Sequence, residues 1–197
     1  MCPGTTGKRI PVDEQDQILW AMAERLVDGD LNACDALFHA LAAPMPALAW
    51  NPDNKGMDQD YLSQVLNWWL VQKGNAAMPS PGTIDPVGLR GLLGNLMILE
   101  PIDEGQDFYM RLYGSNVTSH SHHDLTGQKV SEIWTPLRDY FLVNYRAVYH
   151  RREPLYSLHT PPVQINFSAW KRLILPFGDG QTVTRLMVGI CPTERQE

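Results

Sequence analysis

The stretch Asp107–Gly127 (DFYMRLYGSNVTSHSHHDLTG) constrains the fold of this chain more than any other. In its first part, Asp107–Gly114, apolar side chains occupy alternate positions, which is the period of a β-strand. The segment Asp103–Gln106 contains acidic residues and a glycine, and it separates this strand from the apolar run Leu96–Ile102. We therefore predict a β-hairpin, with a sheet that begins near residue 96.

Helical patterns precede this hairpin. Apolar residues recur at helical spacing within Asp13–Asp28, and acidic residues that suit a helix N-terminus open that segment. Two further helices are predicted, one over Ala33–Ala43 and one from Asp58 to a terminating Gly74. Residues 44–57 are rich in proline, so we interpret them as a linker.

The region after residue 114 continues with a helix and then strands. Residues 115–135 read as short helical turns and loops, and the apolar spacing predicts one longer helix over Pro136–His150. Residues 178–180 are glycine, aspartate and glycine, which favour a hairpin turn. The strands predicted after residue 154 are Leu155–His159, Phe167–Leu175 and Thr182–Ile190. Periodicity alone thus gives an α+β fold with an antiparallel sheet.

Short motifs occur in a fixed order between residues 60 and 191. In Ile84-Asp85-Pro86, the aspartate suits an N-cap and the proline the first position of a helix. The other motifs are Arg111-Leu112-Tyr113-Gly114, Leu125-Thr126-Gly127 and Lys171–Phe177 (KRLILPF). Their order and spacing resemble a family of bacterial PAS-like sensory domains, mostly proteobacterial. The chain departs from that family at Pro81-Gly82, where many members carry a basic residue, so no role of such a residue is expected here.

The resemblance implies a PAS-like five-stranded antiparallel sheet, with the helices of residues 115–150 on one face. It assigns residues 58–197 to the PAS-like sensory domain and residues 1–57 to an N-terminal arm and helical extension. PAS domains commonly dimerise through flanking helices, so we expect a homodimer through the N-terminal helices. The alternative is that these helices cover the outer face of the sheet within one chain.

Composition excludes several classes of partner. The net charge of -6 argues against a nucleic-acid partner and against an anionic membrane surface, since both need clustered cations. No apolar run approaches the ~20 residues that span a bilayer, and residues 1–20 lack the apolar core of a secretory signal. Cys2, Cys34 and Cys191 are widely spaced, which predicts reduced thiols and a cytoplasmic protein.

A small-molecule cavity is expected between the sheet and the Pro136–His150 helix. Such cavities have mostly apolar walls, with a few polar groups that orient the ligand. The expected wall residues are Leu112, Trp134, Phe141, Tyr145 and Trp170, and Arg172 or Arg111 would orient a carboxylate. Two alternatives remain open. Arg111 can instead pair with Asp85 or Asp124, and Lys171, Leu173 and Leu175 can form the inward face in place of Trp170 and Arg172.

The segment His120–Asp124 (HSHHD) contains residue types that bind zinc, nickel or copper. Neighbouring side chains in a loop or strand point apart, so the alternatives are a solvated loop, a metal or haem ligand, and a pH switch. We predict that this segment holds no tightly bound metal. The sequence identifies no cofactor.

No catalytic motif is readable in the chain. It lacks the nucleophile elbow of the hydrolases, phosphate-binding glycine loops and the HExxH metalloprotease motif. The sequence therefore predicts a stand-alone sensory domain that binds a small molecule or a signalling protein without catalysis. One alternative is a small isomerase- or dehydratase-like enzyme that uses His123 and Asp124 as acid and base. Another is an interaction adaptor with a filled core.

Overall fold

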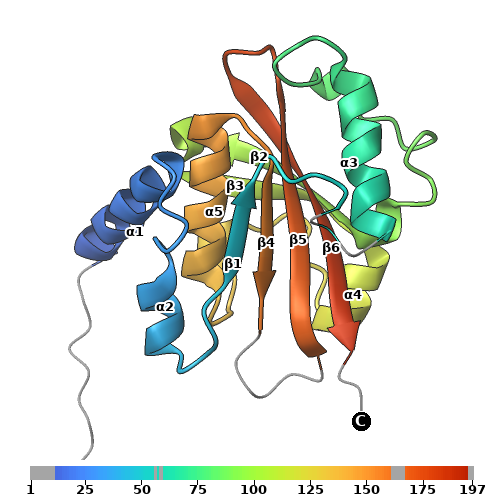
Figure 1. Cartoon of the computed structure of the whole chain (residues 1–197). Coiled ribbons are helices and arrows are strands. Elements are labelled where there is room, and N and C mark those ends of the chain that lie inside the picture. The colour runs from blue at the N-terminus through green and yellow to red at the C-terminus, as the bar shows by residue number, and fades with distance from the viewer. Residues whose placement is uncertain (1–11, 56, 58–59, 161–166, 195–197) are drawn as a thin grey trace, which may run out of the picture.

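The computed structural model describes residues 12–55, 57, 60–160 and 167–194. Its centre is a six-stranded antiparallel sheet with the strand order β1-β4-β5-β6-β2-β3 (Figure 1). The strands are β1 (Ala47–Trp50), β2 (Leu96–Ile102), β3 (Asp107–Tyr113), β4 (Leu155–His159), β5 (Phe167–Gly178) and β6 (Val183–Glu194). The predicted α+β class with an antiparallel sheet is confirmed.

The predicted number of strands was too small by one, because β1 lies within the proposed linker. Ala47–Trp50 pairs with β4, from Ala47 opposite Leu158 to Trp50 opposite Leu155. The prolines of this region flank the strand, and β1 is at the edge of the sheet, where proline next to a strand is tolerated. The linker interpretation is therefore wrong for residues 47–50. The division into residues 1–57 and 58–197 stays a prediction.

Both predicted hairpins are present. In the first, η3 (Asp103–Gly105) joins β2 to β3. In the second, the carboxylate of Asp179 accepts bonds from the amides of Gln181 (2.9 Å) and Thr182 (2.7 Å) between β5 and β6. Gly180 has a φ of +95°, a conformation that glycine adopts without strain. This turn chemistry explains why the pairing was readable in the sequence.

The pairing of β2 with β3 contains a bulge. Ile98 lies opposite Leu112, and the next residue of β2, Leu99, lies opposite Met110. Arg111 is therefore the extra residue, and the alternation of side chains reverses beyond it. Met110 and Tyr113 consequently share one face of the sheet, whereas simple alternation had grouped Met110 with Leu112.

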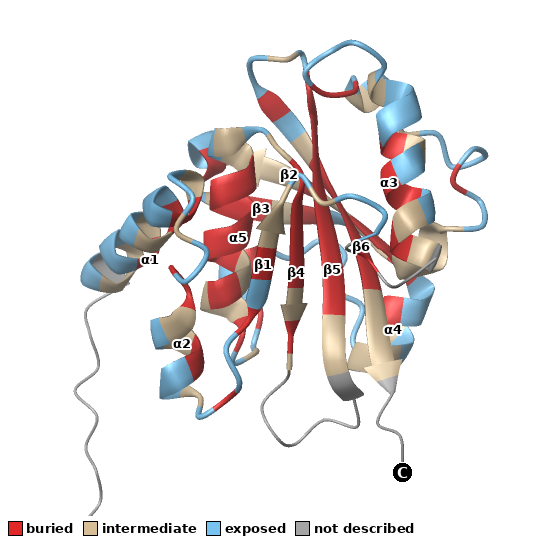
Figure 2. Cartoon of the chain, viewed as in Figure 1, coloured by how far each residue is buried: buried red, intermediate tan, exposed pale blue. Residues whose placement is uncertain are grey.

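Helices cover both faces of the sheet (Figures 1 and 2). The helix α5 (Arg138–Arg151) packs on one face. The helix α4 (Ser115–Ser121) lies on the same side, as predicted for residues 115–150, because Val117 of α4 and Phe141 of α5 line one cavity. The helix α3 (Asp60–Lys73) packs on the opposite face, over β5 and β6. There Gly189 of β6 allows close approach, because a Cβ at this position would lie 3.1 Å from Leu62.

The N-terminal helices pack on the same chain, against α5 rather than against the outer face of the sheet. The helix α1 (Val12–Val27) runs along α5, and α2 (Asp35–Ala40) places Phe38 against Tyr140 of α5, with ring centroids 4.9 Å apart. Arg151 of α5 donates to the carbonyl of Val27 at 2.7 Å. The apolar stripe of α1 is thus largely buried within the chain.

The segment that begins at Ile84-Asp85-Pro86 forms turns rather than the predicted helix. Asp85 does act as a cap, because its carboxylate accepts bonds from the amides of Val87 and Gly88, both at 3.1 Å. Regular structure returns only in the short η2 (Leu93–Asn95). Glycines at 88, 91 and 94 explain the difference, since glycine inside a helix is unfavourable.

Candidate ligand-binding cavity

A cavity of about 930 Å³ lies between the sheet, α4, α5 and the loop that joins these two helices. Much of its wall is apolar or aromatic, and the wall includes Met97, Met110, Tyr113, Val117, Phe141 and Ile190. Polar side chains of residues 119–124 complete the lining on the α4 side. Size and lining are those of a typical small-molecule site.

The loop between α4 and α5 is fixed to the free edge of β3. The amide of Gly127 donates to the carbonyl of Met110 at 2.8 Å, and the amide of Met110 donates to the carbonyl of Gln128 at 2.9 Å. Gly127 has a φ of +88°, and the Asp124 carboxylate accepts from the amide of Thr126 at 2.9 Å. The Leu-Thr-Gly motif thus forms the turn that places this loop on the wall of the cavity.

Most of the residues that the sequence suggested for the cavity do line it. These are Trp134, Phe141, Tyr145, Trp170 and Arg172. Trp134 lies on the connecting loop and is 97% exposed. Trp170 and Arg172 point toward the side of α4 and α5, where Trp170 meets the ring of His120 and Arg172 meets Tyr145. Of the two inward faces considered for β5, the structure therefore has the one with Trp170 and Arg172.

Arg111 and Leu112 do not line this cavity. The bulge at Arg111 reverses the alternation, so Leu112 lies beside Ile98 on the other face. Arg111 forms an ion pair with Glu100, and its guanidinium lies over the ring of Tyr109. The ion-pair interpretation was therefore correct in kind, with Glu100 in place of Asp85 or Asp124.

Several lining residues were missed in the sequence. Tyr113 and Met97 are cross-strand partners on the cavity face, and His159 ends β4 next to Trp170 of β5. The alternation of β4 contained a usable signal for His159, because it shares a face with Leu155 and Ser157. Tyr113 was hidden by the bulge, which leaves no mark in the pattern of apolar residues.

Arg172 has the least usual surroundings in the cavity wall. It is only 3% exposed, and its guanidinium lies 4.1 Å from the ring centroid of Phe141. Its Nη2 donates to the hydroxyl oxygen of Tyr145. Its Nη1 has no hydrogen-bond partner, and no carboxylate pairs with this arginine, among the residues that the structure describes.

Arg146, which is buried to the same extent, shows what Arg172 lacks. Its Nη2 pairs with Asp16 at 2.6 Å and also donates, as does Nε, to the carbonyl of Gln106. A buried cation normally needs a nearby counter-ion to offset the loss of its hydration. The described residues supply this counter-ion to Arg146 and not to Arg172.

The other ionisable groups deep in the site are neutral at physiological pH. Burial, assisted by the charge of Arg172, lowers the pKa of His159 to about 3. Burial also raises the pKa of the hydroxyls of Tyr140 and Tyr145 above their usual range. The lining acids Asp124 and Glu132 are exposed. The buried wall therefore carries a single formal charge, which is that of Arg172.

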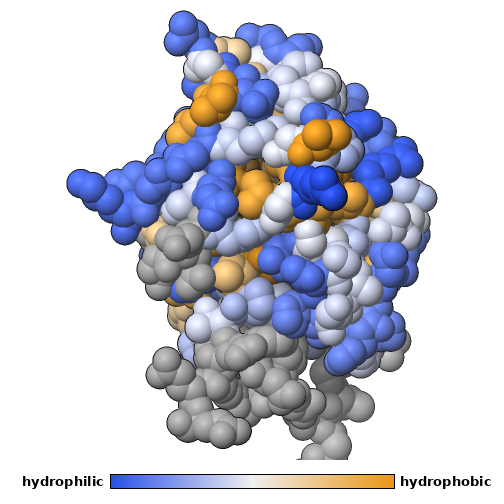
Figure 3. Space-filling model, turned by 90° about the vertical axis from the view of Figure 1, so that its right-hand side faces the viewer, coloured by the Kyte–Doolittle hydropathy of each residue, from blue (hydrophilic) through white to orange (hydrophobic). Residues whose placement is uncertain are grey.

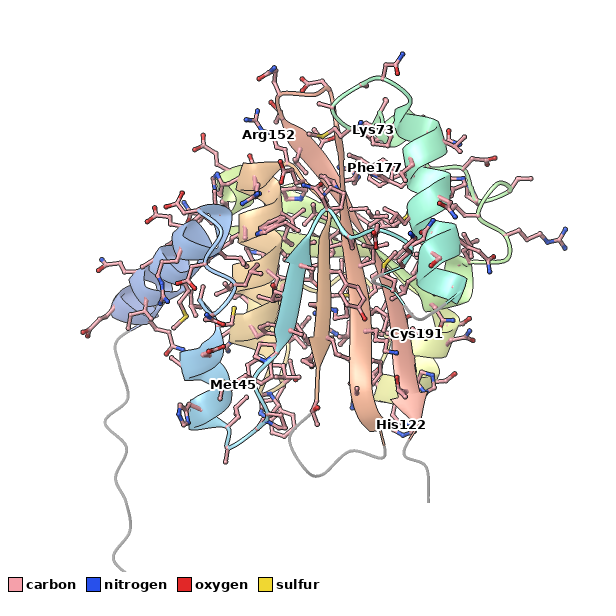
Figure 4. All side chains as sticks on the ribbon, viewed as in Figure 1. Met45, Lys73, His122, Arg152, Phe177 and Cys191 are labelled. Carbon is pink, nitrogen blue, oxygen red and sulfur yellow. The ribbon has the colours of Figure 1, made fainter. Side chains whose placement is uncertain are left out.

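The histidine-rich segment lies where α4 ends and the connecting loop begins. His122 follows α4 in a left-handed conformation, with a φ of +59°, and Figure 4 places it at the end of the molecule where β6 finishes. Within the described parts of the chain, no three histidine, cysteine, aspartate or glutamate side chains cluster closely enough to hold a metal ion. The absence of a tight metal stays a prediction, which elemental analysis of untagged protein tests.

Comparison with known proteins identifies one family. A family model described as "PAS domain" matches residues 57–190, which is more than half of the chain. No curated protein and no solved structure matches. In the described ranges, none of the helices combines the length and the apolar character needed to cross a bilayer.

Proposed function

We propose a function from one premise: this chain belongs to the PAS domain family, which indicates a sensory or signalling role. Within that role, we propose that the cavity beside α5 binds a small organic molecule and that the chain catalyses no reaction. Ligand binding would then alter an exposed surface of this chain that contacts another protein.

The observation that carries this proposal is the composition of the cavity wall. A cavity of about 930 Å³ is lined by apolar and aromatic side chains, by polar side chains on the α4 side, and by one buried arginine. An adaptor with a filled core would have no such space. Sites of this kind hold a ligand by burying its apolar body and orienting it with a few polar contacts.

The enzyme alternative depended on His123 and Asp124 as an acid and base pair. Both residues belong to the cavity lining on the connecting loop, but both are exposed to solvent, and the Asp124 carboxylate already accepts a bond from the Thr126 amide. General acid–base catalysis needs such groups to converge on one position in a substrate pocket. This arrangement therefore favours binding over catalysis.

Signal output requires an exposed surface. On α3 and the nearby turn, Leu70, Val71 and Val87 are exposed apolar residues. Figure 3 shows this side of the molecule, with hydrophobic patches between hydrophilic ones. The helix α1 and the turn that follows it offer a second surface, since Ile18 and Leu31 are partly exposed. We propose that the second surface forms the homodimer and that the first is available to a signalling partner.

Native mass spectrometry of freshly purified protein, compared with a denatured sample, tests the cavity. We expect a bound small molecule that is lost on denaturation. The variant Val117→Phe adds a ring to the cavity wall and should abolish this binding. Val71→Phe makes the same change on the exposed face of α3 and should have no effect. Protein that carries no small molecule, and whose thermal stability no compound of a broad library alters, would contradict the proposal.

A further inference from the structure

We propose that the ligand is a monocarboxylic acid with an apolar body, and that the guanidinium of Arg172 binds its carboxylate. This inference rests on the proposed function, because it names the chemical class of the molecule in the same cavity. It follows from the charge, the available donors and the lining of the site, taken in turn.

The charge of Arg172 lacks a counter-ion. The guanidinium is almost completely shielded from water, and no acidic side chain among the described residues forms an ion pair with it. An anion beside an arginine in such a low-dielectric setting interacts more strongly than it would at the surface. A ligand with one negative charge would therefore supply the counter-ion that Arg172 lacks.

The donors at this point suit a carboxylate. Nη1 of Arg172 makes no hydrogen bond to the described residues, while Nη2 is engaged with the oxygen of Tyr145. The Tyr145 oxygen accepts that bond, so its own O–H remains able to donate. Burial raises the pKa of this phenol, which keeps the proton in place. One carboxylate can thus accept from Nη1 and from the tyrosine hydroxyl.

The lining limits the ligand to one charge and an apolar body. Among the described residues that line the cavity, Arg172 is the sole arginine or lysine, and His159 is neutral at physiological pH. A phosphate or a dicarboxylate brings about two negative charges, and this wall would leave one of them unpaired. The apolar part of the remaining wall, which includes Met97, Phe141 and Ile190, suits a hydrocarbon chain or ring.

Matched acid and amide probes test this assignment. Isothermal titration calorimetry at pH 7.5 would compare 4-phenylbutanoic acid with 4-phenylbutanamide, and octanoic acid with octanamide. The members of each pair differ little except in charge. We expect wild-type protein to bind the acids at least about tenfold more tightly than the amides, which is the size of one charge-assisted hydrogen bond.

Two variants of Arg172 and one control locate the effect. Arg172→Met should remove the preference for the acid and retain binding of the amide. Arg172→Lys keeps the positive charge but lacks the paired N–H donors of the guanidinium, so it should retain part of the preference for the acid. This variant also tests the role of Arg172 if Arg172→Met folds poorly. Arg111→Met removes an arginine outside the cavity and should leave the preference unchanged.

The possible results separate the two proposals. Equal binding of acid and amide overturns the acid assignment and leaves the cavity as a small-molecule site. A preference that survives in Arg172→Met overturns the role of Arg172. A co-purified molecule without an acidic group, seen by native mass spectrometry, overturns the acid class as well. Failure of every probe, together with a ligand-free native spectrum, overturns both the acid assignment and the proposed function.

Discussion

Arg146 and Arg172 are both 3% exposed, yet among the described residues only Arg146 has a carboxylate partner, which is Asp16. Replacing Arg146 by methionine removes the pair with Asp16 and the bonds to the Gln106 carbonyl, so we expect a loss of about 2 kcal/mol in the free energy of unfolding. Replacing Arg172 by methionine removes a buried cation without a carboxylate partner. The ligand-free protein should then change by less than about 1 kcal/mol, or gain stability. Urea unfolding of the two variants, side by side, measures the difference, and a larger loss for Arg172→Met would show that Arg172 is structural.

His159 predicts how stability depends on pH. It is buried among the rings of Phe38, Tyr140 and Phe141, and its pKa is lowered to about 3 by burial and by Arg172. The unfolded chain binds a proton near pH 6.5, whereas the folded chain does so only near pH 3. Because protons bind His159 in the unfolded chain first, the free energy of unfolding decreases as the pH falls from about 6.5 to about 3. The decrease is at most about 1.4 kcal/mol for each pH unit.

Urea unfolding at pH 7.5, 6 and 5 measures this dependence. Acidic residues also titrate in the lower part of this pH range. The contribution of His159 is therefore measured as the difference in slope between wild type and the histidine variants. His159→Gln should flatten the slope between pH 6 and 5. The same change at His39, which is exposed, should not. Equal slopes for wild type and His159→Gln would show that His159 is not kept neutral by the fold.

At the scale of elements, the packing of α1 on α5 makes α1 part of the folded core. Leu26 is fully buried, whereas Ile18 of the same helix is 39% exposed. We expect Leu26→Ala to lower the free energy of unfolding by about 3 kcal/mol, as for other large-to-small core changes. Ile18→Ala should cost less than about 1 kcal/mol. Thermal or urea unfolding checks both, and similar small effects would mean that α1 is not docked on α5 in solution.

The sequence predicted elements whose signals are local. The strand Leu155–His159 has the predicted bounds, and the turn at Asp179 and Gly180 correctly identified the β5–β6 hairpin. The sequence did not predict β1, because a four-residue edge strand between prolines has no periodicity of its own and is defined only by pairing with β4. Glycines likewise reduced the helix expected after Asp85 to turns.

In the candidate site, too, the sequence predicted the features that depend on local spacing and not those that depend on contacts between distant segments. Phe141 and Tyr145 are one helical turn apart on α5, so their shared face could be inferred from the spacing. Leu112 was assigned to the wall on strict alternation, and the bulge at Arg111 places Tyr113 there instead. The missing counter-ion of Arg172 depends on contacts between distant parts of the chain, which no local pattern reports.

At the scale of the whole molecule, α5 connects the cavity to the N-terminal helices. Phe141 and Tyr145 line the cavity, while Asp139 and Arg146 of the same helix contact Gln15 and Asp16 of α1. A ligand that shifts α5 would therefore also bias the position of α1. This gives the proposed sensor a physical route from the binding site to the N-terminal surface, provided that the two positions of α5 differ in ligand affinity.

That route ends at the surface where a homodimer is predicted. The buried side of α1 already packs on α5, so the dimer must use the residues left outside, which include Ile18 and Leu31.

Removing the N-terminal segment would uncover core residues of α5, so point changes in the full chain are the better test. Sedimentation velocity at micromolar concentration should give a dimer for wild type and a monomer for Ile18→Lys combined with Leu31→Lys. Val71→Lys, on the exposed face of α3, should remain dimeric. A monomeric wild-type chain at this concentration rejects the homodimer and leaves the exposed apolar residues of α3 as a surface for a signalling partner.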